Sequence, residues 1–180
     1  MIRLTPLAPL HAAALQPLLE DPAIAATTPF PHPYPPDGAT AYVQESIALR
    51  EAGTKYVFAV CDADGQPIGM VLLKDVDRHK GEAELGYWIG RPHWGQGHAT
   101  EAAAAALTYA FETLGLQAVL GVTLESNPAS LQVLVKLGFV ELARSTWTLP
   151  KWPEPRPCVT LQLTVDAWRA AGETLRRTGQ

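Results

Sequence analysis

The chain has 180 residues, of which 47% are hydrophobic and 18% charged, and its formal net charge is -4. This length predicts one domain that folds without metal or disulfides, and the composition excludes a disordered tail protein. The net negative charge excludes a broad cationic surface for nucleic acid or an anionic membrane, and no apolar run reaches the ~18 residues of a membrane span.

The amino terminus and the cysteines point to a cytoplasmic protein. The first 19 residues only faintly resemble a signal peptide, because Pro6, Pro9 and Pro17 interrupt the apolar run. Cys61 and Cys158 lie far apart without the spacing of metal ligands, which indicates small core residues in a reducing compartment. We therefore expect no metal site and a cytoplasmic location.

The first half of the chain predicts a strand, two helices and a hairpin. In chain order, these are a strand at 2–4, a helix at 10–19, a helix at 38–52, and strands at 56–61 and 68–73 joined by a turn. Residues 28–37 (TPFPHPYPPD) are predicted to be irregular, because their prolines remove backbone donors.

The second half predicts a strand–loop–helix–strand unit followed by further elements. In chain order, these are a strand at 81–89, a loop at 90–98, a helix at 99–114, a strand at 118–124, a helix opened by 126–128, strands at 139–148 and 159–165, and a helix at 166–177. The strands at 81–89 and 118–124 should be parallel, since a crossover helix joins them. The sequence therefore predicts an α/β fold with a sheet of mixed direction.

The segment from Gly90 to Thr100 (GRPHWGQGHAT) leaves a predicted strand and opens a predicted helix. Glycines let a ligand approach the backbone, and the first amides of a helix are free donors, so the segment suits an anion such as pyrophosphate. A mononucleotide P-loop fits poorly, because Gln96 replaces the lysine. A dinucleotide site fits poorly, because Thr100 replaces the third small residue and no second nucleotide-binding half is evident.

Three phrases carry a family resemblance: ELGYWI at 84–89, HWGQGHATEA at 93–102 and ESNPASLQVLVKLGF at 125–139. In this order and spacing, the chain resembles the GNAT superfamily of N-acetyltransferases, and within it the branch of ribosomal-protein N-terminal alanine acetyltransferases. The resemblance covers most of the chain. It implies a single domain over 1–180 with a mixed α/β sheet, a central βαβ unit flanked by helices, and a coenzyme-binding core at about 81–140.

The resemblance also implies acetyl-CoA as co-substrate. In the family, loop amides hold the pyrophosphate, and the matching positions here are Gly95, Gln96, Gly97, His98, Ala99 and Thr100. Trp88 and Ile89 match the strand whose backbone pairs with the pantetheine arm, and Asn127 matches an asparagine that contacts it. Trp94 stands where the superfamily usually has Gln or Arg, and Arg91 is a candidate local cation.

Glu84 is the candidate general base. Strand alternation puts it on the face opposite Leu85, and the resemblance places a family glutamate there. Glu82, on the same face, is a weaker candidate, and a salt-bridged surface role is the competing interpretation of Glu84. The family's usual acid tyrosine falls at Leu134, which cannot donate a proton, so the resemblance leaves Ser130 as donor to the thiolate.

The 16 prolines cluster at 29–36 and 150–157. The resemblance puts the acceptor site between these segments, and the candidate aromatic wall is Phe30, Tyr34, Trp147 and Trp152. His32 is a further candidate base. The competing interpretation is that the prolines only stiffen exposed loops.

We therefore expect an acetyl-CoA-dependent N-acetyltransferase that acts on a primary amine by direct attack in a ternary complex. An α-amine with a pKa of ~7.8 is about one-third neutral at pH ~7.5, whereas a lysine amine is about 0.1% neutral, so a protein N-terminus needs less base catalysis. A small-molecule amine is the other acceptor class, with no nucleic-acid or membrane partner and a monomer or homodimer. The alternatives are a catalytically silent acyl-CoA-binding module and, more distantly, a nicotinamide-dependent oxidoreductase.

Overall fold

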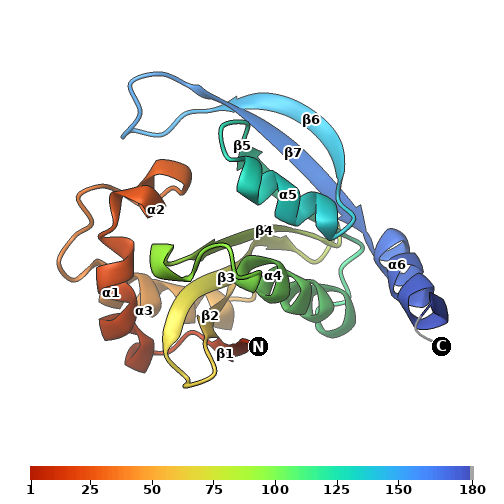
Figure 1. Cartoon of the computed structure of the whole chain (residues 1–180), viewed down its shortest axis with the longest axis horizontal. Helices are drawn as coiled ribbons and strands as arrows, with labels where there is room; N and C mark the ends of the chain where they lie inside the picture. The colour runs from red at the N-terminus through yellow and green to blue at the C-terminus, as the bar shows by residue number, and fades with distance from the viewer. Residues whose placement is uncertain (179–180) are drawn as a thin grey trace.

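The computed structural model describes residues 1–178, and these form a seven-stranded sheet that organises the fold (Figure 1). The strand order is β1-β2-β3-β4-β5-β7-β6, and only β4 and β5 are parallel neighbours. The strands are β1 (Arg3–Pro6), β2 (Tyr56–Cys61), β3 (Pro67–Asp77), β4 (Glu82–Ile89), β5 (Ala118–Leu124), β6 (Val140–Trp147) and β7 (Arg156–Thr164). The predicted mixed α/β sheet with a central βαβ unit is confirmed.

Helices cover both faces of this sheet. The α-helices are α1 (Ala12–Leu19), α2 (Pro22–Thr27), α3 (Gly38–Glu51), α4 (His98–Thr108), α5 (Pro128–Lys136) and α6 (Val165–Thr178). Single turns at Pro9–His11 and Arg91–His93 are 3-10 helices, and α4 continues into a π-helical turn at Tyr109–Thr113. None of the helices described is long and apolar enough to span a membrane.

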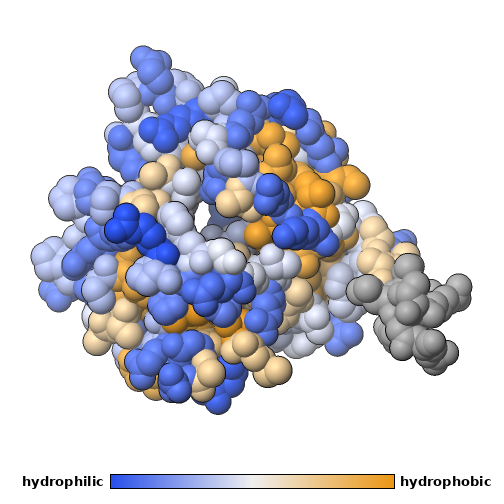
Figure 2. Space-filling model, in the orientation of Figure 1, coloured by the Kyte–Doolittle hydropathy of each residue, from blue (hydrophilic) through white to orange (hydrophobic). Residues whose placement is uncertain are grey.

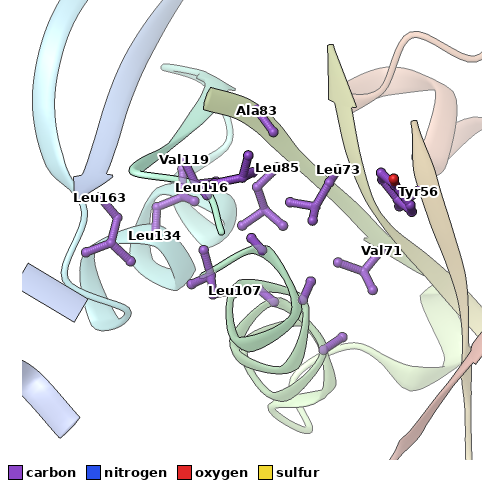
Figure 3. Close-up of a cluster of buried hydrophobic side chains, with 14 of the residues drawn as sticks. Tyr56, Val71, Leu73, Ala83, Leu85, Leu107, Leu116, Val119, Leu134 and Leu163 are labelled. Atoms are coloured by element: carbon purple, nitrogen blue, oxygen red, sulfur yellow. The ribbon is translucent and has the colours of Figure 1, made fainter. Parts of the chain in front are cut away.

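Two large clusters of buried apolar side chains hold the layers together. On one face, Leu85 and Val119 pack with Leu107 of α4 and Leu134 of α5 (Figure 3). On the other face, the side chains of α1 and α3 pack on β2, β3 and Trp88. The alternation predicted for β4 is therefore confirmed. Cys61 and Cys158 are buried free thiols, as expected of core residues.

The short helix α2 was not predicted. Its six residues are too few to show a helical period, but it carries a recognisable start. The Asp21 carboxylate accepts a hydrogen bond from the Ala23 amide at 2.9 Å, and Pro22 occupies the first helical turn. An Asp-Pro pair of this kind is a helix-start signal that sequence reasoning could have used.

The two parallel strands separate before they end. Paired positions run from Glu82 with Ala118 to Leu85 with Gly121, and no pair follows. We call the space between residues 86–89 of β4 and 122–124 of β5 the wedge. Figure 2 shows a hollow near the middle of the molecule, which in the same view of Figure 1 falls between α2 and α5, above β4. The fold thus leaves an opening beside the start of α4.

Candidate active site

The glycine loop presents an open surface of backbone to solvent. Gly95 and Gly97 have φ values of +74° and +81°, and a Cβ at either position would meet nothing within 4 Å. Side chains rarely adopt this backbone conformation, so glycine is favoured here by conformation and not by crowding. Gly97 is the residue that caps α4.

The start of α4 supplies unpaired donors. The first hydrogen bond of the helix runs from the Glu101 amide to the Gly97 carbonyl at 3.1 Å, which leaves the amides of His98, Ala99 and Thr100 ahead of the helical pattern. The Nδ1 atom of His98 is also buried without a partner. Together these groups fit an anionic ligand such as the coenzyme pyrophosphate.

Three neighbouring side chains are engaged elsewhere. Glu101 accepts a hydrogen bond from the Ile2 amide at 3.1 Å, in accord with a structural role. The Trp94 indole nitrogen donates to the Ile89 carbonyl at 2.5 Å, so this aromatic residue fixes the loop to the end of β4. Arg91 forms an ion pair with Asp21 at 3.1 Å and thereby connects the loop to α2.

The edge of β4 that faces the wedge carries different backbone groups from those expected. The Gly90 amide bonds to the Ile68 carbonyl of the β3 side at 2.8 Å. Because bonding direction alternates along an antiparallel strand, the Trp88 backbone also points to β3, whereas the backbones of Tyr87 and Ile89 point to the wedge. For a contact with the pantetheine arm, Tyr87 and Ile89 are therefore better placed than Trp88. The buried Trp88 side chain packs in the cluster beneath α1 and α3.

Glu84 lies on the same face of β4 as Trp88, opposite α4 and α5. Its Oε1 atom is 2.9 Å from Lys74 Nζ, and the two side chains are 25% and 35% exposed. The ion pair predicted as the competing interpretation is thus present, and the second carboxylate oxygen has no ion-pair partner among the residues described. Glu82 is on the same face, two residues farther from the wedge.

Ser130 and Asn127 lie at the start of α5, across the wedge from β4. Asn127 caps the helix, because its side chain accepts a hydrogen bond from the Ser130 amide at 3.2 Å. The Tyr87 hydroxyl is 3.0 Å from Ser130 Oγ and donates to the Ser130 carbonyl at 3.0 Å. Burial raises the pKa of Tyr87 to about 12, so its hydroxyl stays protonated at neutral pH. Sequence analysis did not single out Tyr87, although strand alternation puts its side chain on the face of β4 that also carries Leu85.

Leu134, at the position of the family's acid tyrosine, is 2% exposed. A Cβ added to Gly121 would lie 2.8 Å from Leu134 Cδ2, so the leucine fills the space over this glycine of β5. It serves packing and has no donor. Any hydrogen-bond donor on this side of the wedge must come from another residue, and Ser130, in contact with Tyr87, is the candidate.

The four predicted acceptor aromatics form two pairs and not one continuous wall. Phe30 and Tyr34 meet edge to face at 5.8 Å, and Phe30 also meets Trp88 at 6.1 Å. Trp147 and Trp152 meet edge to face at 5.5 Å. Phe30 and Tyr34 lie in the connection between α2 and α3 and pack in the cluster beneath α1 and α3, whereas Trp147 ends β6 and Trp152 lies in the β6–β7 loop. His32, the further candidate base, is exposed.

Comparison with known proteins agrees with this architecture. The family model described as an acetyltransferase (GNAT) domain matches residues 2–140. The chain therefore belongs to the GNAT acetyltransferase family. Two solved structures share its fold. One is a Vibrio cholerae spermidine N-acetyltransferase in complex with CoA and spermine, with a TM-score of 0.82 and 20% identity over 93% of this chain and 98% of that chain. The other is RimL, a ribosomal L7/L12 alpha-N-protein acetyltransferase in complex with coenzyme A, with a TM-score of 0.84 and 17% identity over 92% of this chain and 95% of that chain.

Sequence relatives point to the same family. The putative ribosomal N-acetyltransferase YdaF of Bacillus subtilis is 37% identical over 91 residues, which are 51% of this chain and 46% of that protein. The aligned part spans about half the length of the first curated relatives that it matches.

Proposed function

We propose that this chain transfers the acetyl group of acetyl-CoA to a primary amine by direct attack within a ternary complex. The observation that carries the proposal is the opening of β4 from β5 beside an uncovered helix start. The amides after Gly97 hold the pyrophosphate, and the pantetheine arm runs through the wedge against the backbone of Tyr87 and Ile89 and past Asn127. The thioester then lies between the two faces of the sheet.

The two faces supply different chemistry in this arrangement. Glu84 lies on the α1–α3 face, and its carboxylate takes, directly or through water, the one proton that the neutral amine must lose once it has attacked. The neutral nitrogen attacks the thioester carbon, and a β4 amide at the wedge donates to the developing oxyanion. As the C–N bond forms and the C–S bond breaks, the electron pair stays on sulfur. The nitrogen loses one proton toward Glu84.

Ser130 stabilises the leaving thiolate from the opposite face. Its hydroxyl donates a hydrogen bond to sulfur, and Tyr87 is a positioning residue whose hydroxyl proton is shared between the Ser130 carbonyl and Oγ atoms, each 3.0 Å away, which leaves the serine proton free for the sulfur. A tyrosine with a pKa of about 12 keeps its proton at neutral pH, so Tyr87 donates a hydrogen bond but does not transfer a proton. Tyr87→Phe should therefore lower kcat by about 3- to 10-fold, the effect of one lost neutral hydrogen bond, and leave the Kd of coenzyme A unchanged.

A thiol-release assay with acetyl-CoA and a panel of primary amines tests the proposal. Glu84→Gln should spare coenzyme binding and lower kcat/KM by at least about 10-fold, since general-base catalysis commonly contributes about 100-fold or more. Glu82→Gln is the matched control on the same face and should stay near the wild-type rate. Coenzyme binding without turnover of any amine would refute the proposed function and favour a silent binding module.

A further inference from the structure

Lys151, in the loop between β6 and β7, contacts three backbone carbonyls of a distant segment. Its Nζ donates to the carbonyls of Ala25, Thr28 and Phe30, the second at 2.6 Å. These carbonyls belong to the last turn of α2 and the chain just after it. A helix leaves its final carbonyls unpaired and slightly negative, so an ammonium group suits this position.

Arg156, at the start of β7, reinforces this contact. Its guanidinium lies 4.6 Å from the centre of the Trp152 ring, and Lys151 Nζ lies 5.6 Å from the same centre. Arg156 also approaches the Ala26 carbonyl at 3.5 Å. We call Lys151 and Arg156 the cationic clamp, and the buried Trp152 is the apolar surface that both cations share.

The cationic clamp joins the two sides of the wedge. On the β5 side, Trp152 packs with Leu124 and Cys158. On the β4 side, Phe30 packs on Trp88, and Arg91 pairs with Asp21 at the start of α2. Helix α2 is thus held at its start by the ion pair to the β4 side and at its end by Lys151 of the β6–β7 loop, which Figure 1 shows above α2. Helix α2 and the β6–β7 loop together thus form a boundary across the wedge.

This boundary lies on the face that carries the candidate base. Leu124 and Val122 of β5 pack with Trp152 in the loop cluster, whereas Val119 packs in the α4 cluster, so Trp152 is on the face of the sheet opposite α4. Glu84 and Trp88 share that face of β4. An acceptor that reaches the thioester from the Glu84 side therefore passes the cationic clamp.

The cationic clamp carries two positive charges that have no paired carboxylate among the side chains described. Neither Lys151 nor Arg156 takes part in an ion pair with the side chains that the structure describes, and the carbonyl contacts satisfy hydrogen bonds without cancelling charge. Burial, followed by repulsion from Arg156, lowers the pKa of Lys151. A cation that passes this boundary meets repulsion, and a carboxylate meets attraction.

We propose that the cationic clamp selects the acceptor by charge, so that the substrate is a primary amine on a neutral or acidic molecule and not a polycation such as a polyamine. This inference rests on the proposed acetyl transfer and adds the substrate class. Lys151 is the main specificity-determining residue, because it both closes the boundary and carries charge.

Three peptide amides test this selection by kcat/KM in the thiol-release assay: Ala-Glu-Glu, Ala-Gly-Gly and Ala-Arg-Arg, each with a single primary amine. Coulomb's law gives about a three-fold effect for each charge ~8–10 Å from the clamp in a largely aqueous opening. We expect Ala-Glu-Glu to exceed Ala-Arg-Arg by about 10-fold or more, and spermidine to be the poorest acceptor. In Lys151→Met the ratio between the two peptides should fall at least about three-fold, whereas Lys151→Arg should retain it.

Controls separate charge from loosening of the loop. Lys136→Met removes an exposed lysine at the far end of α5 and should leave the ratio unchanged. Arg156→Met should lower the ratio less than Lys151→Met, and all variants should keep the Kd of coenzyme A. A wild-type preference for spermidine or Ala-Arg-Arg, or an equal ratio in Lys151→Met and wild type, would overturn the inference while acetyl transfer stands. No turnover of any acceptor by coenzyme-binding protein would overturn both.

Discussion

Gly97→Ala offers a test of the coenzyme loop that separates backbone strain from ligand contact. Gly97 has a φ of +81° and caps α4, and a Cβ there would meet nothing within 4 Å. An L-residue in the left-handed region costs about 1–2 kcal/mol. In a chain of this size that cost lowers Tm by about 2–8 °C, so the variant should remain folded at room temperature.

Gly115→Ala is the matched control. Gly115 has a φ of +69°, and a Cβ there also has open space, but it lies beyond the opposite end of α4. Both variants should therefore lose similar free energies of unfolding. Only Gly97→Ala should weaken coenzyme A, because relaxing its φ turns the His98 amide away from the ligand. The loss of one hydrogen bond to a charged group, about 1.5–3 kcal/mol, corresponds to about a 10- to 150-fold rise in Kd.

Calorimetric titration with coenzyme A and thermal unfolding measure these two quantities. Equal rises in Kd for both variants would show that strain alone disturbs binding and would refute the assignment of the loop. An unchanged Kd in Gly97→Ala, with the expected fall in Tm, would place the pyrophosphate elsewhere.

Two further predictions concern stability. Leu134→Ala should lower the free energy of unfolding by about 2–5 kcal/mol, as measured in urea, because it leaves a cavity over Gly121 where the leucine side chain is only 2% exposed. A loss under about 1 kcal/mol would contradict a core role for Leu134. Burial lowers the pKa of His11 from 6.5, and its Nδ1 accepts from the Ala8 amide at 3.0 Å. As pH falls, the unfolded state therefore takes up a proton on His11 before the folded state does. The free energy of unfolding should be full above pH 6.5 and should decrease as the pH drops toward the lowered pKa of the folded state. Thermal scans at pH 5 and 7.5 measure this decrease, and His11→Asn should reduce it.

Much of the central fold could be predicted because its signals are local. The strands at 56–61 and 118–124 coincide with β2 and β5, and the alternation along β4 places Glu84 and Leu85 on opposite faces as expected. Helix α2 escaped prediction because six residues hold too little periodicity. The predicted acceptor wall came from residue type and loop position, neither of which shows which aromatic rings meet.

The sequence by itself determined the strand–loop–helix core, the need for glycine at 95 and 97, and the absence of a donor at position 134. Each of these depends on a residue's own chemistry or on neighbours within a few positions. Only the tertiary structure decided that Lys74 pairs with Glu84, that Tyr87 reaches Ser130, and that Lys151 donates hydrogen bonds to carbonyls in and just after α2. The Tyr87–Ser130 contact joins residues 43 positions apart, and the Lys151 contacts join residues up to 126 positions apart. Contacts between residues so far apart in the sequence depend on sheet order and strand separation, which no local pattern encodes.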